Sequence, residues 1–185
     1  MLGATCYVLR ADVAIRIGIS ACLLGQEVRY DGGHKRNQSL VDALRRHFEL
    51  VPVCPELEVG MGVPREPVRL VREGGGLRMR TVDSNIDYTD VMNHWSSRRL
   101  EALAAQDLAG FVLKKDSPSC GLAGVKTYSQ GEPARDGRGL FAAALMNRFP
   151  EMPAEDEERL ADPKLLDNFI QRVFAYHTSV RQPND

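Results

Sequence analysis

The stretch Ile15-Arg16-Ile17-Gly18-Ile19-Ser20 is a short, mostly apolar run that ends just before Cys22. A brief β-prone run bounded by polar residues predicts a buried strand of an α/β sheet. Two further runs repeat this arrangement of strand and cysteine: residues 48–53 (FELVPV) before Cys54, and residues 110–113 (GFVL), which lead through the polar segment 114–119 to Cys120.

The three cysteines follow strands that we expect to lie in one sheet. In open α/β sheets, ligands bind outside the carboxyl ends of the strands. If these strands run parallel, thiols that are far apart in the sequence meet at one edge of the sheet. Three cysteines at such an edge predict a metal or cluster site with one coordination position left open. The fourth cysteine, Cys6, lies outside this pattern and is expected to be a bystander.

Helical and strand-forming segments alternate along the rest of the chain. The sequence predicts helices over 38–48, 90–106, 140–149 and 163–176, a hairpin over 68–82 and a short strand at 125–128. This alternation predicts an α/β fold, a single domain with a mostly parallel central sheet and helices on both faces. The fold is expected to be Rossmann-like without a dinucleotide fingerprint, because the chain lacks a Gly-x-Gly-x-x-Gly motif between a strand and a helix.

Composition limits the class of protein. The net charge of −1 disfavours a general nucleic-acid binder. No apolar stretch approaches the roughly 18 residues of a membrane span, so we expect no membrane partner. Four cysteines in 185 residues are too few for a disulfide scaffold and fit a reducing, cytoplasmic location.

We expect three segments along the chain. Residues 1–14 form an N-terminal extension, residues 15–150 the α/β domain, and residues 151–185 an acidic linker with a C-terminal helix. The linker interpretation depends on six acidic residues against one arginine between positions 151 and 162. Five arginines between positions 65 and 80 fit either a solvated hairpin or a guide for a phosphorylated or RNA substrate.

Five short motifs occur in order along the chain: SACLLG at 20–25, VRYDGGH at 28–34, PVCPE at 52–56, GVPREP at 62–67 and SPSCG at 117–121. This series resembles the thiouracil desulfurase (TudS-like) family over roughly residues 15–150. The segment 158–176 resembles the longer members, in which this domain precedes a YbgA-like helical domain and which are similar to thiouridine desulfidases. The resemblance implies an enzyme that removes sulfur from a thiolated uracil or uridine. It also implies that residues 151–185 are the remnant of a junction to that helical domain.

The resemblance further implies a [4Fe-4S] cluster whose three ligands are Cys22, Cys54 and Cys120. Three thiolates leave one iron open to a soft thiocarbonyl sulfur, which oxygen can replace without net redox change. Glu56 follows the second ligand and Ser117 precedes the third. We assign Glu56 as general base or acid, and Ser117 as the residue that orients substrate or water.

The other polar residues of the motifs are candidates for substrate binding: Arg29, Tyr30, Asp31, Arg65 and Ser119. A guanidinium would bind a phosphate and a phenol ring would stack on a base, whereas Asp31-Gly32-Gly33 also fits an ordinary turn. The expected substrate is a thiolated pyrimidine, either free thiouracil, a nucleoside such as 4-thiouridine, or a residue of tRNA.

Two other functions remain open at this point. A zinc hydrolase would use three cysteines and a metal-bound water, and a non-catalytic iron–sulfur module would bind without turnover. Two features depart from the family pattern. Asp116 stands where a Lys-Ser-Lys-Ser type of run would place a basic residue, and the chain stops at Asp185, without the helical domain. If that domain grips tRNA, a free base or small nucleoside is the expected substrate.

Overall fold

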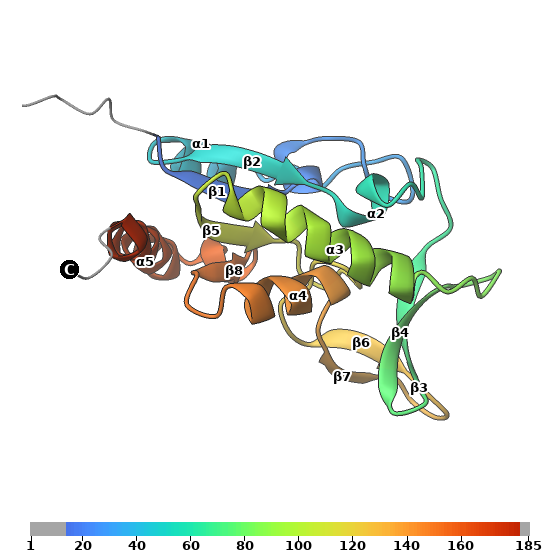
Figure 1. The fold of residues 1–185 in the computed structure, drawn as a ribbon. Coiled ribbons are helices and arrows are strands. Elements are labelled where there is room, and N and C mark those ends of the chain that lie inside the picture. Colours follow the sequence, from blue (N-terminus) through green and yellow to red (C-terminus); the bar gives the residue numbers. More distant parts are fainter. Residues whose placement is uncertain (1–13, 182–185) are drawn as a thin grey trace, which may run out of the picture.

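A four-stranded parallel sheet lies at the centre of the computed structural model, which describes residues 14–181 (Figure 1). Its strands are β1 (Arg16–Ser20), β2 (Glu49–Val53), β5 (Leu108–Leu113) and β8 (Ala154–Asp156), in the order β2-β1-β5-β8. The three strands predicted from apolar runs are neighbours in this sheet, and both of their pairings are parallel, as predicted.

Helices cover both faces of the parallel sheet, which confirms the predicted α/β architecture. One face carries α1 (Gln38–Arg45) and α5 (Pro163–Arg181), and the other carries α3 (Thr89–Ala104) and α4 (Leu140–Arg148), which lie in front in Figure 1. Ile19, Leu44 and Phe169 are buried in the first core, and Phe111 and Phe141 in the second. Each helix begins at or next to its predicted first residue.

A second, mixed sheet lies at the lower right of Figure 1 and was not predicted as a separate layer. Its strands are β3 (Val68–Glu73), β4 (Gly76–Thr81), β6 (Val125–Tyr128) and β7 (Ala134–Gly137), in the order β4-β3-β6-β7. The first two form the predicted hairpin, with Gly74 and Gly75 at φ angles of 57° and 82°, which glycine adopts without steric cost. Leu70, Met79 and Met92 pack this sheet against α3.

The structure corrects the interpretation of residues 151–162 as a solvated linker. This segment contains β8, which pairs with β5, and the short 3-10 helix η2 (Arg159–Ala161). Glu157 in the same segment is only 7% exposed. The C-terminal helix α5 also belongs to the core, because Phe169 and Val173 are buried against the parallel sheet. Residues 1–13 of the predicted extension, with Cys6, lie outside the described residues.

The chain adds strands to the parallel sheet in opposite directions on either side of the β1–β5 pair. This change of direction indicates where the site lies. From β1 the chain passes through α1 to β2, whereas from β5 it passes through α4 to β8 on the opposite side. Such a reversal opens a crevice at the carboxyl ends of the strands. The short helices η1 (Ala21–Leu24) and α2 (Pro55–Glu58) and the loop 114–121 directly follow β1, β2 and β5. Within residues 14–181, no helix combines the length and hydropathy that crossing a membrane requires.

Candidate active site

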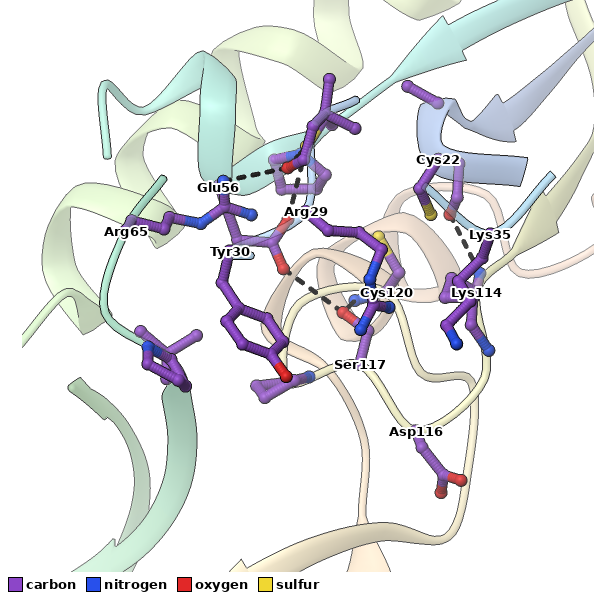
Figure 2. A pocket seen from close by; sticks show the side chains of 18 of the residues that line it. Cys22, Arg29, Tyr30, Lys35, Glu56, Arg65, Lys114, Asp116, Ser117 and Cys120 are labelled. Carbon is purple, nitrogen blue, oxygen red and sulfur yellow. Dashed lines mark hydrogen bonds between the residues drawn. The ribbon is translucent and has the colours of Figure 1, made fainter. Parts of the chain in front are cut away.

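A cavity of about 350 Å³ lies at this edge of the parallel sheet. Cys22, Cys54 and Cys120 all line it, which confirms the predicted convergence of three thiols from distant parts of the sequence. None of the three forms a disulfide. Figure 2 shows that Glu56 and Ser117, the two residues assigned to proton transfer and orientation, border the same space.

Short helical turns hold the first two cysteines. Cys22 lies in η1, and its carbonyl oxygen accepts a hydrogen bond of 2.9 Å from the Lys35 amide. Cys54 is the N-cap of α2, and its amide donates to Glu58 Oε1 at 3.1 Å. Arg99 pairs with the other oxygen of Glu58 at 3.0 Å. Glu58 therefore has a structural role as a helix cap, because its carboxylate accepts a hydrogen bond from the N-cap amide, which has no partner within the helix.

The third cysteine is held by a loop that docks on the first turn of α4. The Cys120 amide donates to Ser117 Oγ at 3.0 Å. The Ala142 amide, one of the free donors of the α4 N-terminus, donates to the Ser119 carbonyl at 3.0 Å. This docking needs a glycine at position 139, because a Cβ on Gly139 would lie 2.3 Å from the Ser119 carbonyl oxygen. The Gly139 amide also donates to the Gly121 carbonyl at 2.8 Å, so backbone contacts fix the loop on both sides of the cysteine.

The acid wall of the cavity consists of Glu56 and the two serines that hold it, Ser117 and Ser119. Ser119 Oγ donates to Glu56 Oε1 at 2.5 Å, and Ser117 Oγ donates to the same oxygen at 3.3 Å. The second carboxylate oxygen, Oε2, accepts a weak hydrogen bond from Cys54 Sγ at 3.7 Å. Among the described residues, no cation pairs with Glu56. Its carboxylate is therefore oriented by neutral donors.

The cationic wall of the cavity consists of Lys35 and Lys114, which lie on the side of Cys22 and away from Glu56 (Figure 2). Lys114 directly follows β5, and its backbone amide donates to Ser20 Oγ at 2.9 Å. Neither lysine was predicted to line the site. A signal for Lys114 was present, since it is the first residue after a strand whose carboxyl end was expected to face the site.

Burial raises the pKa of all three thiols. Burial, and after it the charge of Glu56, raises the pKa of Cys22 to about 11 and that of Cys54 to about 12. The same two causes raise the pKa of Cys120 well above its usual value. Without a bound metal, the thiols are therefore protonated near neutral pH. A coordinating metal deprotonates a thiol outright, so binding would release protons here.

Positive charges around the cavity act in the opposite direction. Lys114 and Arg29 lower the pKa of the Cys22 thiol, and Arg65 lowers the pKa of Cys54. Buried thiolates require such compensation, because burying unpaired charge costs much free energy. Three thiolates with nearby cations form a donor set of the kind that iron–sulfur clusters use. The residues present thus fit such a cluster.

A single metal ion fits this arrangement less well. Within residues 14–181, no three His, Cys, Asp or Glu side chains are gathered so that they could hold one ion. Ligands of a single ion must all lie within a bond length of one point. The thiolates of a cluster bind different irons and lie farther apart.

The structure brings only part of the predicted substrate-binding set to the cavity. Arg29, Tyr30 and Arg65 line it, and the guanidinium of Arg29 lies 5.4 Å from the centroid of the Tyr30 ring. Ser119 is wholly buried and makes its contact with Glu56 instead. Asp31 does not line the cavity, because its Oδ1 accepts a hydrogen bond of 3.0 Å from the Gly33 amide in a turn. For Asp31, the turn interpretation agrees with the structure.

Most arginines of the basic segment 65–80 have structural partners. Arg65 donates to the carbonyl oxygens of Val28 and Gly62, both at 2.9 Å, and so braces the loops around the cavity. Three others pair with carboxylates on or beside the mixed sheet: Arg72 with Asp136 at 2.7 Å, Arg80 with Glu73 at 2.8 Å, and Arg78 with Asp90 at 3.5 Å. These pairs agree with a solvated hairpin.

Comparison with known proteins gives three findings. The chain matches the 2-thiouracil desulfurase family over residues 17–157. It is 28% identical over 144 residues to the uncharacterized protein YbbK of Bacillus subtilis (strain 168), covering 75% of this chain and 95% of that protein. A solved structure described as a [4Fe-4S]-dependent thiouracil desulfidase, TudS, is similar with a TM-score of 0.66 and 32% identity, covering 83% of this chain and 97% of that one.

The matched region begins in β1 and ends at the residue after β8, so it contains every cysteine, acid and hydroxyl of the site described above. The fold of the similar structure is the same mixed α/β arrangement. The chain therefore belongs to the 2-thiouracil desulfurase family, enzymes that act on thiolated pyrimidines.

Proposed function

We propose that this chain is a non-redox desulfidase that uses a [4Fe-4S] cluster to replace the thiocarbonyl sulfur of a small thiolated pyrimidine by oxygen. The observation that carries the proposal is the shared cavity of about 350 Å³, where Cys22, Cys54 and Cys120 meet Glu56. Each cysteine comes from a different segment at the carboxyl edge of the sheet, so the convergence is a property of the fold.

The three cysteines would hold the cluster through their thiolates. When bound, a cluster with three protein ligands supplies an iron with an open position, which acts as a Lewis acid toward a thiocarbonyl sulfur. Among the described residues, no three side chains are gathered to hold one metal ion, which supports a cluster over a zinc ion. A carboxylate beside the thiols supports turnover over a purely structural cluster.

Glu56 is the proposed general base. Its Oε1 is occupied by Ser119 and Ser117, at 2.5 Å and 3.3 Å. Among the described residues, its Oε2 accepts only from the thiol of Cys54, at 3.7 Å. Once Cys54 gives up its proton to become a ligand, Oε2 loses that donor. It is then the oxygen that takes a proton from the attacking water.

Ser117 is the proposed orienting residue. Its Oγ accepts from the amides of Ser119 and Cys120 at 3.2 Å and 3.0 Å, which fixes the oxygen. The hydroxyl hydrogen is then free to point toward Glu56 or toward a water in the cavity. This geometry lets Ser117 hold the water, or the substrate oxygen, within reach of the carboxylate.

The cavity supports a free base or nucleoside over tRNA as substrate. Its volume of about 350 Å³ falls within the usual range for small-molecule sites. Tyr30 lines it and is 42% exposed, so its ring is available to stack on a pyrimidine. Both arginines that line the cavity have partners, Arg65 with the carbonyl oxygens of Val28 and Gly62 and Arg29 with Asp31 at 3.5 Å. The net charge of −1 also offers little attraction to a polyanion.

Anaerobic reconstitution with iron and sulfide, followed by removal of free sulfide, tests this function. The protein is then incubated with 2-thiouracil, 4-thiouridine or thiolated tRNA, and released sulfide and the oxo base are both quantified. We expect sulfide and oxo product in equal amounts from the free base or nucleoside. Cluster assembly without turnover of any of the three would contradict the proposal, and turnover of tRNA alone would contradict the substrate assignment.

A further inference from the structure

Ser20 is a buried polar residue of the cavity to which the proposed chemistry gives no role. It is the last residue of β1, it lines the cavity, and it is only 2% exposed. Its Oγ accepts a hydrogen bond of 2.9 Å from the amide of Lys114, the first residue beyond β5. The side chain therefore ties the end of β1 to the loop that carries Cys120.

This contact leaves the hydroxyl hydrogen of Ser20 free to donate. A serine hydroxyl has one donor and two acceptor sites, and the Lys114 amide uses an acceptor site. A buried hydroxyl needs a partner for its hydrogen, because an unmade hydrogen bond costs free energy. Burial, and after it the charge of Glu56, raises the pKa of Cys120, whereas a hydrogen bond from the Ser20 side chain lowers it. The sulfur of Cys120 is therefore the partner of this hydroxyl.

Each of the three thiols has a neighbour that favours its thiolate form, and the kind of neighbour differs. Cations of the cavity lower the pKa of Cys22 and of Cys54. At Cys120, which is 4% exposed, the neutral hydroxyl of Ser20 acts in this direction. A buried thiolate needs such compensation, because burying an unpaired charge costs much free energy.

A hydrogen bond to a ligand sulfur affects more than the stability of the fold. The donor withdraws electron density from the thiolate, so the iron that this thiolate binds becomes poorer in electrons. Hydrogen bonds to the sulfurs are accordingly among the factors that set the reduction potential of an iron–sulfur cluster. An iron poorer in electrons is also a stronger Lewis acid toward a thiocarbonyl group.

We propose that the Ser20 hydroxyl donates to the Cys120 thiolate when Cys120 is a cluster ligand, and that Ser20 is thereby a positioning residue that adjusts the electron density of the cluster. The hydrogen bond from the Lys114 amide holds the donating oxygen in place. This inference rests on the cluster of the proposed function, but its test does not require turnover.

The reduction potential of the cluster tests this role, because a merely structural contact would not change it. After anaerobic reconstitution, the potential is measured by electron paramagnetic resonance during a titration with dithionite. Ser20→Ala should give a more negative potential, since a hydrogen bond to sulfur favours the more negative, reduced state. We expect a change of about tenfold in this equilibrium, which corresponds to about 59 mV for a one-electron couple.

Two further variants serve as controls. Ser20→Thr keeps the hydroxyl and should have the wild-type potential. Ser96→Ala removes a hydroxyl that is also buried but lies on α3, outside the cavity. This variant should leave the potential unchanged. A shift in Ser20→Ala alone therefore identifies the hydroxyl beside Cys120 as its cause.

A vibrational measurement covers the case in which Ser20→Ala does not retain a cluster. After brief transfer of the wild type to D2O, hydroxyl hydrogens exchange, whereas hydrogen-bonded backbone amides in the folded core exchange slowly. The iron–thiolate stretching bands of the resonance Raman spectrum should then shift in wild type and in Ser20→Thr. Equal potentials in wild type and Ser20→Ala, or bands that do not respond to D2O, would overturn the inference. A wild-type cluster that releases no sulfide would instead count against the proposed function.

Discussion

The two walls of the cavity are built by different physical means. On the acid wall, neutral serine hydroxyls hold Glu56, and among the described residues it has no ionic partner. On the cationic wall, Lys114 is fixed by a largely buried ion pair with Glu157. Neutral donors orient a carboxylate and leave it able to exchange protons, whereas an ion pair keeps an ammonium charged. This difference suits Glu56 to the proton transfer that we propose for it, and Lys114 to lowering the pKa of the Cys22 thiol.

Removal of a proposed cluster ligand should have the largest effect. Without the cluster, neither the acid wall nor the cationic wall has a reaction to support. We expect Cys120→Ala to lose bound iron and turnover together, to the background of untreated protein. Iron and acid-labile sulfide are counted after anaerobic reconstitution. Cys6→Ala, outside the segment that resembles the family, is the control and should keep both. Full iron content in Cys120→Ala would show that the ligand assignment is wrong.

The next largest effect should come from Ser117, on the acid wall. Ser117→Ala should lower kcat by about a hundredfold, the lower end of the cost of losing a positioned hydrogen-bond donor at a reacting centre. Because Ser117 Oγ also accepts from the Cys120 amide, iron content must be measured in the same sample. Ser117→Thr keeps the hydroxyl and should recover most of the rate. A Ser117→Ala enzyme with full iron content and a normal kcat would contradict the orienting role that we assign to Ser117.

Ser119 should have a smaller, mostly structural effect. Ser119→Ala removes the buried hydroxyl that donates to Glu56 Oε1. Loss of a hydrogen bond to a charged group should lower the free energy of unfolding by roughly 1–3 kcal/mol, measured by urea denaturation of the metal-free protein. With Glu56 less well oriented, kcat should fall severalfold while KM stays nearly constant. If Ser119→Ala changed KM and left the free energy of unfolding unchanged, Ser119 would be a substrate-binding residue instead.

The smallest effect should come from the second carboxylate of α2. Glu58 caps the Cys54 amide and pairs with Arg99. We expect Glu58→Gln to lower the free energy of unfolding by roughly 1 kcal/mol, the usual scale of a helix cap. The pH profile of kcat should be the same as in wild type. A shifted profile would mean that Glu58 shares the proton chemistry assigned to Glu56.

The parallel sheet and its cysteines could be predicted because their signals are local. Apolar runs mark β1, β2 and β5, and the carboxyl ends of neighbouring parallel strands meet whatever the sequence distance. β8 could not be found this way. Its three residues, Ala154–Asp156, include two acids and form a strand only because they pair with β5. Strand formation at such a position depends on tertiary context more than on propensity.

The same limit applies to the site. Glu56 and Ser117 could be assigned because they adjoin two of the cysteines in sequence. The contact of Glu157 with Lys114 spans 43 residues, and no local pattern reveals it. The sequence predicts Ser119 to be a substrate-binding residue, but the loop turns its hydroxyl toward Glu56. The direction of the Ser119 side chain depends on how the loop 114–121 docks on α4. The spacing of residues in the sequence does not reveal this docking.

Glu56→Gln tests most directly whether the acid wall performs proton transfer beside a cluster held by three cysteines. This change keeps the shape of the side chain and its contacts with Ser117 and Ser119, but removes the basic oxygen. After anaerobic reconstitution, iron content and sulfide release from 2-thiouracil and 4-thiouridine are measured in the same preparation. We expect wild-type iron content and a kcat lowered by about a hundredfold or more, as for loss of a general base. Wild-type turnover by a fully loaded Glu56→Gln enzyme would contradict this assignment.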